Sequence, residues 1–216
     1  MDDDQELEFG RLAQALSLST IEQLAVDLHG GQTSADGEPR VRHLYAVADL
    51  ASRLSRGYFE DMGPCSQAYW STVCQATGLL HESVCRGLAF EDLVTAADES
   101  VARAVVDGTP DFRLPAPLRL ERYINQLGLA SGPVQLVKLC DLRHEAGLRL
   151  RSLNGRPKPV IRESAAVWLA ETRLIVPVLT KVPSLVTAPQ LRRLEADTQR
   201  LDFALKRLES KRRTKE

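Results

Sequence analysis

Three separated stretches of the sequence carry side chains of the types that bind divalent metals. His43 follows a polar loop, and His81-Glu82 follows an apolar run. Asp141 lies in a third stretch, much further along the chain. Imidazole nitrogen and carboxylate oxygen atoms suit manganese and related divalent ions, and such an ion can supply hydroxide near neutral pH. If the fold brings these side chains together, they predict a hydrolytic metal site.

An ordinary structural role is the alternative for the same residues. Asp141 lies in a largely apolar part of a predicted helix, where a carboxylate is costly to bury without a metal or an ionic partner. Arg143 and Arg149 are candidate ionic partners on the same helix. In this alternative His43 caps a helix and His81 is hydrogen-bonded at a helix end. Residue types and spacing alone leave both interpretations open.

Helical periodicity extends over nearly the whole chain, and helices must therefore position the candidate residues. No alternation of apolar and polar residues is long enough for a sheet. The pattern predicts an all-α, single-domain fold with about nine to ten helices. The predicted helices are Ser19 to His29 with a capping box at Ser19 and Glu22, Val41 to Arg56, Gln67 to Leu80, two short helices that start at Phe90 and Asp98, Leu118 to Leu127, a helix capped by Ser131 that reaches Leu150, Pro159 to Pro177, and a last helix from Ala188.

Charge and cysteine content exclude several classes of protein. The 28 Lys and Arg nearly balance the 29 Asp and Glu, and a formal charge of −1 argues against general nucleic-acid binding. Cys65, Cys74, Cys85 and Cys140 have no CxxC spacing, which excludes a zinc ribbon and favours reduced thiols in the cytoplasm. No stretch approaches the roughly 18 apolar residues of a membrane span, so we expect no membrane partner.

Five motifs in order resemble the hydrolase domain of RelA/SpoT-type proteins, a branch of the HD phosphohydrolase superfamily. The family opens with a helix that ends in a His, a Gln shortly after it, and a Ser-Gly-Glu-Pro-Tyr turn. This chain has His29, Gln32 and Gly37-Glu38-Pro39 there. The resemblance implies a stand-alone HD-type helical bundle. The matching stretches are residues 24–48, 79–82, 90–109, 137–144 and 170–179.

The resemblance also implies a site and a reaction. A divalent metal, usually Mn²⁺, would be held by His43, His81, Glu82 and Asp141, and Glu82 and Asp141 would serve catalysis. The reaction would release pyrophosphate from the 3′ position of (p)ppGpp or a related nucleotide. The residues implied to bind this substrate are Lys138, Arg86 and His144.

The chain departs from the family motif at several positions. Glu82 replaces an Asp, and Cys85-Arg86 replaces the Glu-Asp pair whose Glu helps to activate water. A thiol and a guanidinium cannot replace a carboxylate base. Glu145 replaces an Asn that contacts the nucleotide, and Ser34-Ala35-Asp36 replaces a loop with a base-stacking Arg and a Ser. We therefore expect a weak enzyme or an altered substrate, unless another acid such as Glu145 or Glu91 replaces the missing base.

Two other functions are compatible with the sequence. A degenerate HD domain would bind a nucleotide or a protein partner without catalysis. A helical interaction module without a ligand is suggested by the leucines of 188–209. A homo-oligomer is possible in each case. We divide the chain into an N-terminal segment (1–18), the helical domain (19–209) and a basic tail (210–216).

Overall fold

The computed structural model describes residues 3–34, 37–155, 157–179 and 187–213. Within these ranges the chain forms ten α-helices and no strand, which confirms the predicted all-α, single-domain class. None of the described helices is long and apolar enough to cross a membrane. The α-helices are α1 (Asp3–Ala15), α2 (Leu18–His29), α3 (Arg40–Tyr58), α4 (Pro64–Leu80), α5 (Phe90–Ala96), α6 (Glu99–Asp107), α7 (Ala116–Leu129), α8 (Gly132–Ser152), α9 (Pro159–Ile175) and α10 (Ala188–Arg213).

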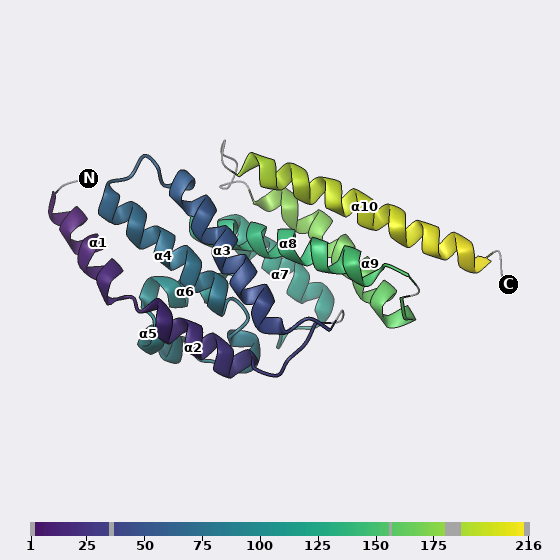
Figure 1. Ribbon diagram of the computed structural model, residues 1–216, viewed down its shortest axis with the longest axis horizontal. Coiled ribbons are helices and arrows are strands. Elements are labelled where there is room, and N and C mark those ends of the chain that lie inside the picture. Colours follow the sequence, from purple (N-terminus) through teal and green to yellow (C-terminus); the bar gives the residue numbers. More distant parts are fainter. Residues whose placement is uncertain (1–2, 35–36, 156, 180–186, 214–216) are drawn as a thin grey trace.

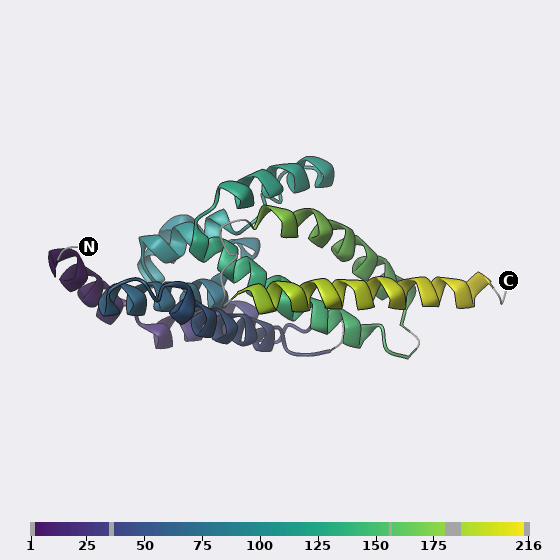
Figure 2. The same cartoon turned by 90° about the horizontal axis from the view of Figure 1, so that it is seen from above.

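Helices α3, α4 and α8 pack against one another at the centre of the molecule (Figure 1). Helices α1, α2 and α6 pack on α4 at one end, while α10 packs along α8 at the other. Figure 2 shows α7 and α9 on the side of α8 away from α3. Three clusters of buried apolar side chains fill the space between the described helices, and Trp70 packs against two of them. The central three helices are thus fixed from both ends, and they carry the candidate residues.

A close approach of α3 and α4 sets the spacing of two of these helices. Gly78 lies so near α3 that a Cβ atom placed on it would be 2.7 Å from Ala48 Cα. Only glycine allows the two backbones to come this close without a shift. The approach brings the C-terminal end of α4 next to the first turns of α3.

The structure corrects the predicted start of α2 and adds a helix before it. The N-cap of α2 is Ser17, whose hydroxyl accepts a hydrogen bond from the backbone N–H of Thr20 at 3.4 Å, so the predicted capping box at Ser19 is wrong. The segment 1–18 contains α1, which the sequence analysis did not predict. The Phe9 ring of α1 packs beside Tyr69, with ring centroids 5.3 Å apart. At the other terminus, α10 continues to Arg213, into the range predicted as a tail.

Candidate metal centre

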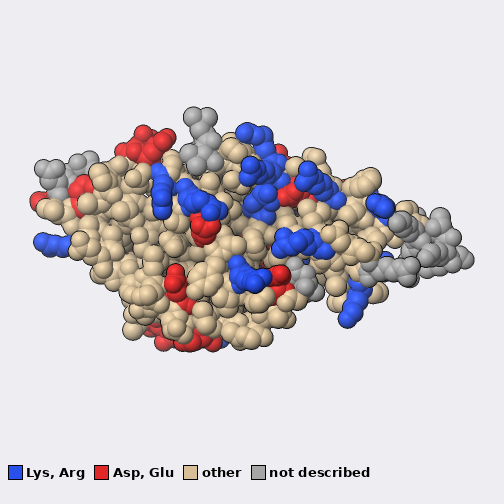
Figure 3. Space-filling model, viewed as in Figure 1, with Lys and Arg blue, Asp and Glu red and all other residues tan. Residues whose placement is uncertain are grey.

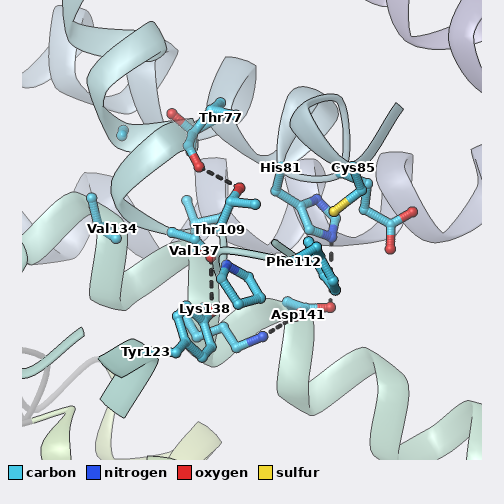
Figure 4. Close-up of a pocket in the computed structure, with 15 residues that line it drawn as sticks. Thr77, His81, Cys85, Thr109, Phe112, Tyr123, Val134, Val137, Lys138 and Asp141 are labelled. Carbon is cyan, nitrogen blue, oxygen red and sulfur yellow. Dashed lines mark hydrogen bonds and ion pairs between the residues drawn. The ribbon is translucent and has the colours of Figure 1, made fainter. Parts of the chain in front are cut away.

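Two of the central helices and the residue that follows the third bring three donor atoms close together. His43 lies in the first turns of α3, His81 directly follows α4, and Asp141 lies in the middle of α8. His43 Nε2 is 3.2 Å from His81 Nε2 and 3.2 Å from Asp141 Oδ1. The third edge, from His81 Nε2 to Asp141 Oδ1, is 3.6 Å. Figure 4 shows the His81 ring and the Asp141 carboxylate facing each other across the edge of a pocket.

Hydrogen bonds on the outer sides of the two imidazole rings orient them. His81 Nδ1 lies 2.8 Å from the Gly78 carbonyl oxygen, which can only accept, so Nδ1 carries a proton. His43 Nδ1 lies 2.8 Å from His144 Nδ1, and a proton donated there leaves His43 Nε2 with its lone pair. When both rings are neutral and His43 is the donor to His144, two nitrogen lone pairs and a carboxylate oxygen face one another. Such a set of acceptors requires a cation or a proton between them.

The dimensions of this triangle fit a divalent metal. In an octahedral site with ligands at about 2.1 Å, neighbouring ligand atoms lie about 3 Å apart. The observed edges of 3.2, 3.2 and 3.6 Å are slightly longer. Two imidazoles and one carboxylate on one face are a donor set that binds divalent transition metals with open positions opposite. The outer hydrogen bonds of the rings match those that usually orient metal-binding histidines.

Charges around the triangle favour an ionised Asp141. Burial opposes ionisation, but the Lys138 ammonium, 2.8 Å from Asp141 Oδ2, and the two imidazoles hold the pKa of Asp141 well below its usual value. Burial also opposes protonation of His81, yet its contact with Asp141 raises the pKa of His81. Lys138 is 5.5 Å from the centroid of the Tyr123 ring. Asp141 therefore supplies a negative charge to the site at neutral pH.

The Glu82 carboxylate lies beside the triangle but is bound by an arginine. A ligand atom of Glu82 is within 4.8 Å of those of His43 and His81. Arg40, the first residue of α3, donates from Nε to Glu82 Oε2 at 2.7 Å and from its Nη2 to Oε1. Its Nη1 donates to Glu145 Oε1 at 2.9 Å. Burial of Glu82 opposes ionisation, but the Arg40 guanidinium outweighs it and lowers the pKa of Glu82.

A pocket opens beside the triangle. It has a volume of about 180 Å³ and is lined on its polar side by His81, Lys138 and Asp141 (Figure 4). Cys85 borders this pocket and also two neighbouring hollows of about 490 and 540 Å³. Burial raises the pKa of the Cys85 thiol, which is therefore uncharged at neutral pH. Arg86 donates to the Gln32 side-chain oxygen and lines the 490 Å³ hollow. The arrangement offers cations and open space next to the three donor atoms.

Of the three contacts expected from a purely structural role of the same residues, the structure contradicts two and confirms one. Asp141 pairs with Lys138 rather than with Arg143 or Arg149. His43 caps no helix, because the N-cap of α3 is Pro39. His81 does have the expected hydrogen bond at a helix end.

Other candidate residues have distinct positions. His144 lies behind His43 and borders a groove between α3, α8 and α10, away from the pocket beside His81. Glu145 lies close to His43, whereas Glu91 is exposed on α5 and belongs to neither group of potential metal ligands. Ala35 and Asp36 lie outside the described residues.

Arg40 is the residue at this site that the sequence analysis missed. The available signal was an arginine directly after Gly37-Glu38-Pro39, where the resembling motif has tyrosine. An arginine that follows a loop is usually solvated, and here its side chain is only 20% exposed.

Comparison with known proteins identifies the fold. No protein-family model matches the chain, and no curated protein does. Among the matching solved structures is that of a metazoan ortholog of SpoT, which hydrolyzes ppGpp and plays a role in starvation responses. The two chains are 20% identical, and the match covers 85% of this chain and 96% of that one with a TM-score of 0.64. The chain therefore has a divergent SpoT-like HD fold.

Proposed function

We propose that this protein is a metal-dependent phosphohydrolase of the HD type that acts on a guanosine polyphosphate or a related phosphorylated nucleotide. The observation that carries the proposal is the convergence of His43 Nε2, His81 Nε2 and Asp141 Oδ1 beside a pocket with a lysine. The fold shared with a protein that hydrolyzes ppGpp supports the substrate class. We expect the protein to act in the cytoplasm.

The donor set supports a resident divalent metal, for which we propose Mn²⁺. His43, His81 and Asp141 would hold it, and Glu82 is the fourth candidate ligand. Such an ion supplies a Lewis acid and lowers the pKa of water. The outer hydrogen bonds to Gly78 and His144 keep the two rings in the orientation in which Nε2 can bind.

The remaining polar residues can bind and orient a phosphorylated substrate. Lys138 lines the pocket beside His81, and its pKa lies above its usual value, because Asp141 and Tyr123 outweigh the effect of burial. Arg86 and Arg40 line the adjoining hollow of about 490 Å³. Phosphate oxygen atoms are good acceptors for these cations. His144, in contact with His43 and outside this pocket, fits a role in orienting that ring.

Water activation is the weakest part of the site. An uncharged Cys85 thiol cannot accept a proton as a carboxylate does, and the absence of a general base costs about 10²–10⁴ in rate. Glu145 does not substitute for it, because Arg40 and Arg149 bind its carboxylate. We therefore expect slow turnover of (p)ppGpp or a preference for another phosphorylated nucleotide.

Incubation of the manganese-loaded protein with ppGpp, followed by chromatographic separation of GDP and pyrophosphate, tests the proposal. We expect slow release of pyrophosphate that His81→Ala and Asp141→Ala abolish. Asp49→Ala is the matched control, since this exposed carboxylate pairs with Arg53 away from the pocket. The proposal is wrong if the wild-type protein binds no Mn²⁺, or if it binds Mn²⁺ but hydrolyses no member of a panel of guanosine and adenosine polyphosphates.

A further inference from the structure

Arg40, Glu82 and Glu145 form an ionic cluster that adjoins the three donor atoms. The side chains are 20%, 22% and 12% exposed, so water screens the cluster only partly. Glu145 is also bound from its other side by Arg149 Nη2, at 3.3 Å from Oε2. Arg40 is thus held between two carboxylates, one of which is itself anchored.

Both oxygen atoms of Glu82 accept a hydrogen bond from this arginine. Oε2 accepts from Arg40 Nε at 2.7 Å, and Oε1 accepts from its Nη2. A two-point contact between guanidinium and carboxylate has little freedom, because the two planar groups must stay in register. In contrast, no described arginine contacts the atoms His43 Nε2, His81 Nε2 and Asp141 Oδ1. The four candidate ligands therefore differ: three point at a common centre, while the fourth is bound to a competing cation.

We propose that Arg40 excludes Glu82 from the metal's coordination, so that this chain binds its divalent ion through His43, His81 and Asp141 alone. The inference rests on the proposed function, because it assumes that a divalent ion binds there. A site with three protein ligands keeps open positions for water and for oxygen atoms of a ligand. It also binds the ion less tightly than a site with four.

Mn²⁺ affinity, measured by electron paramagnetic resonance of the free ion and by calorimetry on the whole chain, tests this assignment. Glu82→Gln removes the candidate ligand. Glu145→Gln is the matched control, because it removes the same charge from the same arginine. A ligand atom of Glu145 also lies within 4.8 Å of those of His43 and Asp141, so both variants are compared with the wild type as well as with each other. If neither glutamate is a ligand, the two variants bind Mn²⁺ within about 3-fold of each other, and neither binds it more than about 10-fold more weakly than the wild type. A larger loss in both variants would make both glutamates ligands and would refute the inference. If Glu82 is a ligand, Glu82→Gln binds Mn²⁺ about 10- to 100-fold more weakly than Glu145→Gln, and the inference is wrong.

A second pair of variants tests the role of Arg40 itself. Arg40→Met releases Glu82, and we expect Mn²⁺ to bind at least about 10-fold more tightly than to the wild type. In Arg40→Met/Glu82→Gln that gain disappears. A gain that persists in the double variant cannot come from ligation by Glu82 and would refute the inference. If Arg40→Met does not fold, the comparison of Glu82→Gln with Glu145→Gln still decides.

The outcomes separate this inference from the proposed function. A wild-type chain that binds no Mn²⁺ overturns both. A chain that binds Mn²⁺ and loses it specifically in Glu82→Gln overturns only the three-ligand assignment. Equal Mn²⁺ affinities of Glu82→Gln and Glu145→Gln support the three-ligand assignment. So does tighter Mn²⁺ binding in Arg40→Met that disappears in Arg40→Met/Glu82→Gln.

Discussion

Asp141→Asn removes the only carboxylate that Lys138 contacts among the described ion pairs. The Lys138 side chain is 18% exposed, so the substitution leaves a largely buried ammonium without its partner. Removing one partner of a buried pair costs about 3–5 kcal/mol, and we take about 3 kcal/mol because Lys138 keeps its contact with the Tyr123 ring. In a chain of this size, 1 kcal/mol corresponds to about 2–4 °C in Tm. Without metal, we therefore expect Asp141→Asn to melt about 6–12 °C below the wild type.

The response to Mn²⁺ separates the ion pair from the metal site. A ligand present at 100 times its Kd stabilises the folded state by about 2.7 kcal/mol. This corresponds to a rise in Tm of about 5–11 °C for the wild type. Asp141→Asn, which lacks one of the three converging donors, is expected to show no rise at the same concentration. Asp49→Asn serves as the control, because it removes an exposed carboxylate paired with Arg53.

Thermal unfolding followed by circular dichroism, in EDTA and in Mn²⁺, measures both effects. Since the pKa of Asp141 lies well below its usual value, its contribution to stability is complete above about pH 4 and is lost as pH falls further. Because Asp141 also raises the pKa of His81, the difference between wild type and Asp141→Asn in EDTA should grow as pH falls from neutral to about 6 and shrink in acid below about pH 4. Equal rises in Tm with Mn²⁺ for both proteins would refute the metal assignment. Equal Tm values in EDTA would refute the ion-pair argument.

Three further substitutions test separate parts of the site. Cys85→Glu places a carboxylate where the pocket and its neighbouring hollows meet. We expect this variant to turn over ppGpp about 10²-fold faster than Cys85→Gln. Equal rates of the two variants in chromatographic assays would contradict this expectation. Gly78→Ala forces a Cβ atom to within 2.7 Å of Ala48 Cα. Chemical denaturation should therefore show a free energy of unfolding that is lower by about 1–3 kcal/mol. An unchanged midpoint would show that α3 and α4 can move apart at no cost. Arg40→Met leaves the Glu82 carboxylate without its guanidinium and should cost about 3 kcal/mol at pH 7. Because the pKa of Glu82 is lowered in the folded state, this cost should shrink as pH falls below about 4, and a cost independent of pH would argue against the contact.

Apolar periodicity was sufficient to predict the central helices. The stretch predicted as helical from Val41 to Arg56 is α3, Arg40–Tyr58, since its apolar face packs on two neighbouring helices. The helix α1 was not predicted, and two of its apolar side chains, Leu7 and Leu12, are exposed rather than part of a buried face. Its stability depends on contacts with α4, such as that of Phe9 with Tyr69, which the local sequence does not reveal. Local patterns therefore predict helices that bury a regular stripe and miss those that depend on a few distant contacts.

The candidate site was predictable from residue types only with the help of a family resemblance. His43, His81 and Asp141 are far apart in sequence, and no periodicity relates positions on three different helices. The resemblance put them together, and the structure places their donor atoms within 3.2–3.6 Å of one another. The partner of Asp141 was not predictable in the same way. Lys138, one turn before it, makes the ion pair instead of either arginine that follows it on α8.

Arg40, Glu82 and Glu145 are three positions at which this chain departs from the resembling motif, and their side chains form one ionic cluster. Glu82 places a carboxylate beside His43 and His81, and Glu145 places one beside His43 and Asp141. Carboxylates gathered around one site repel one another and destabilise the fold. Arg40 contacts both of these glutamates and offsets that repulsion. If position 145 carried the Asn of the motif, Arg40 would lose its ion pair with Glu145 and keep only Glu82 as an anionic partner. The cluster therefore explains why Glu82 remains ionised beside His43 and His81, because the Arg40 guanidinium contacts both of its oxygen atoms.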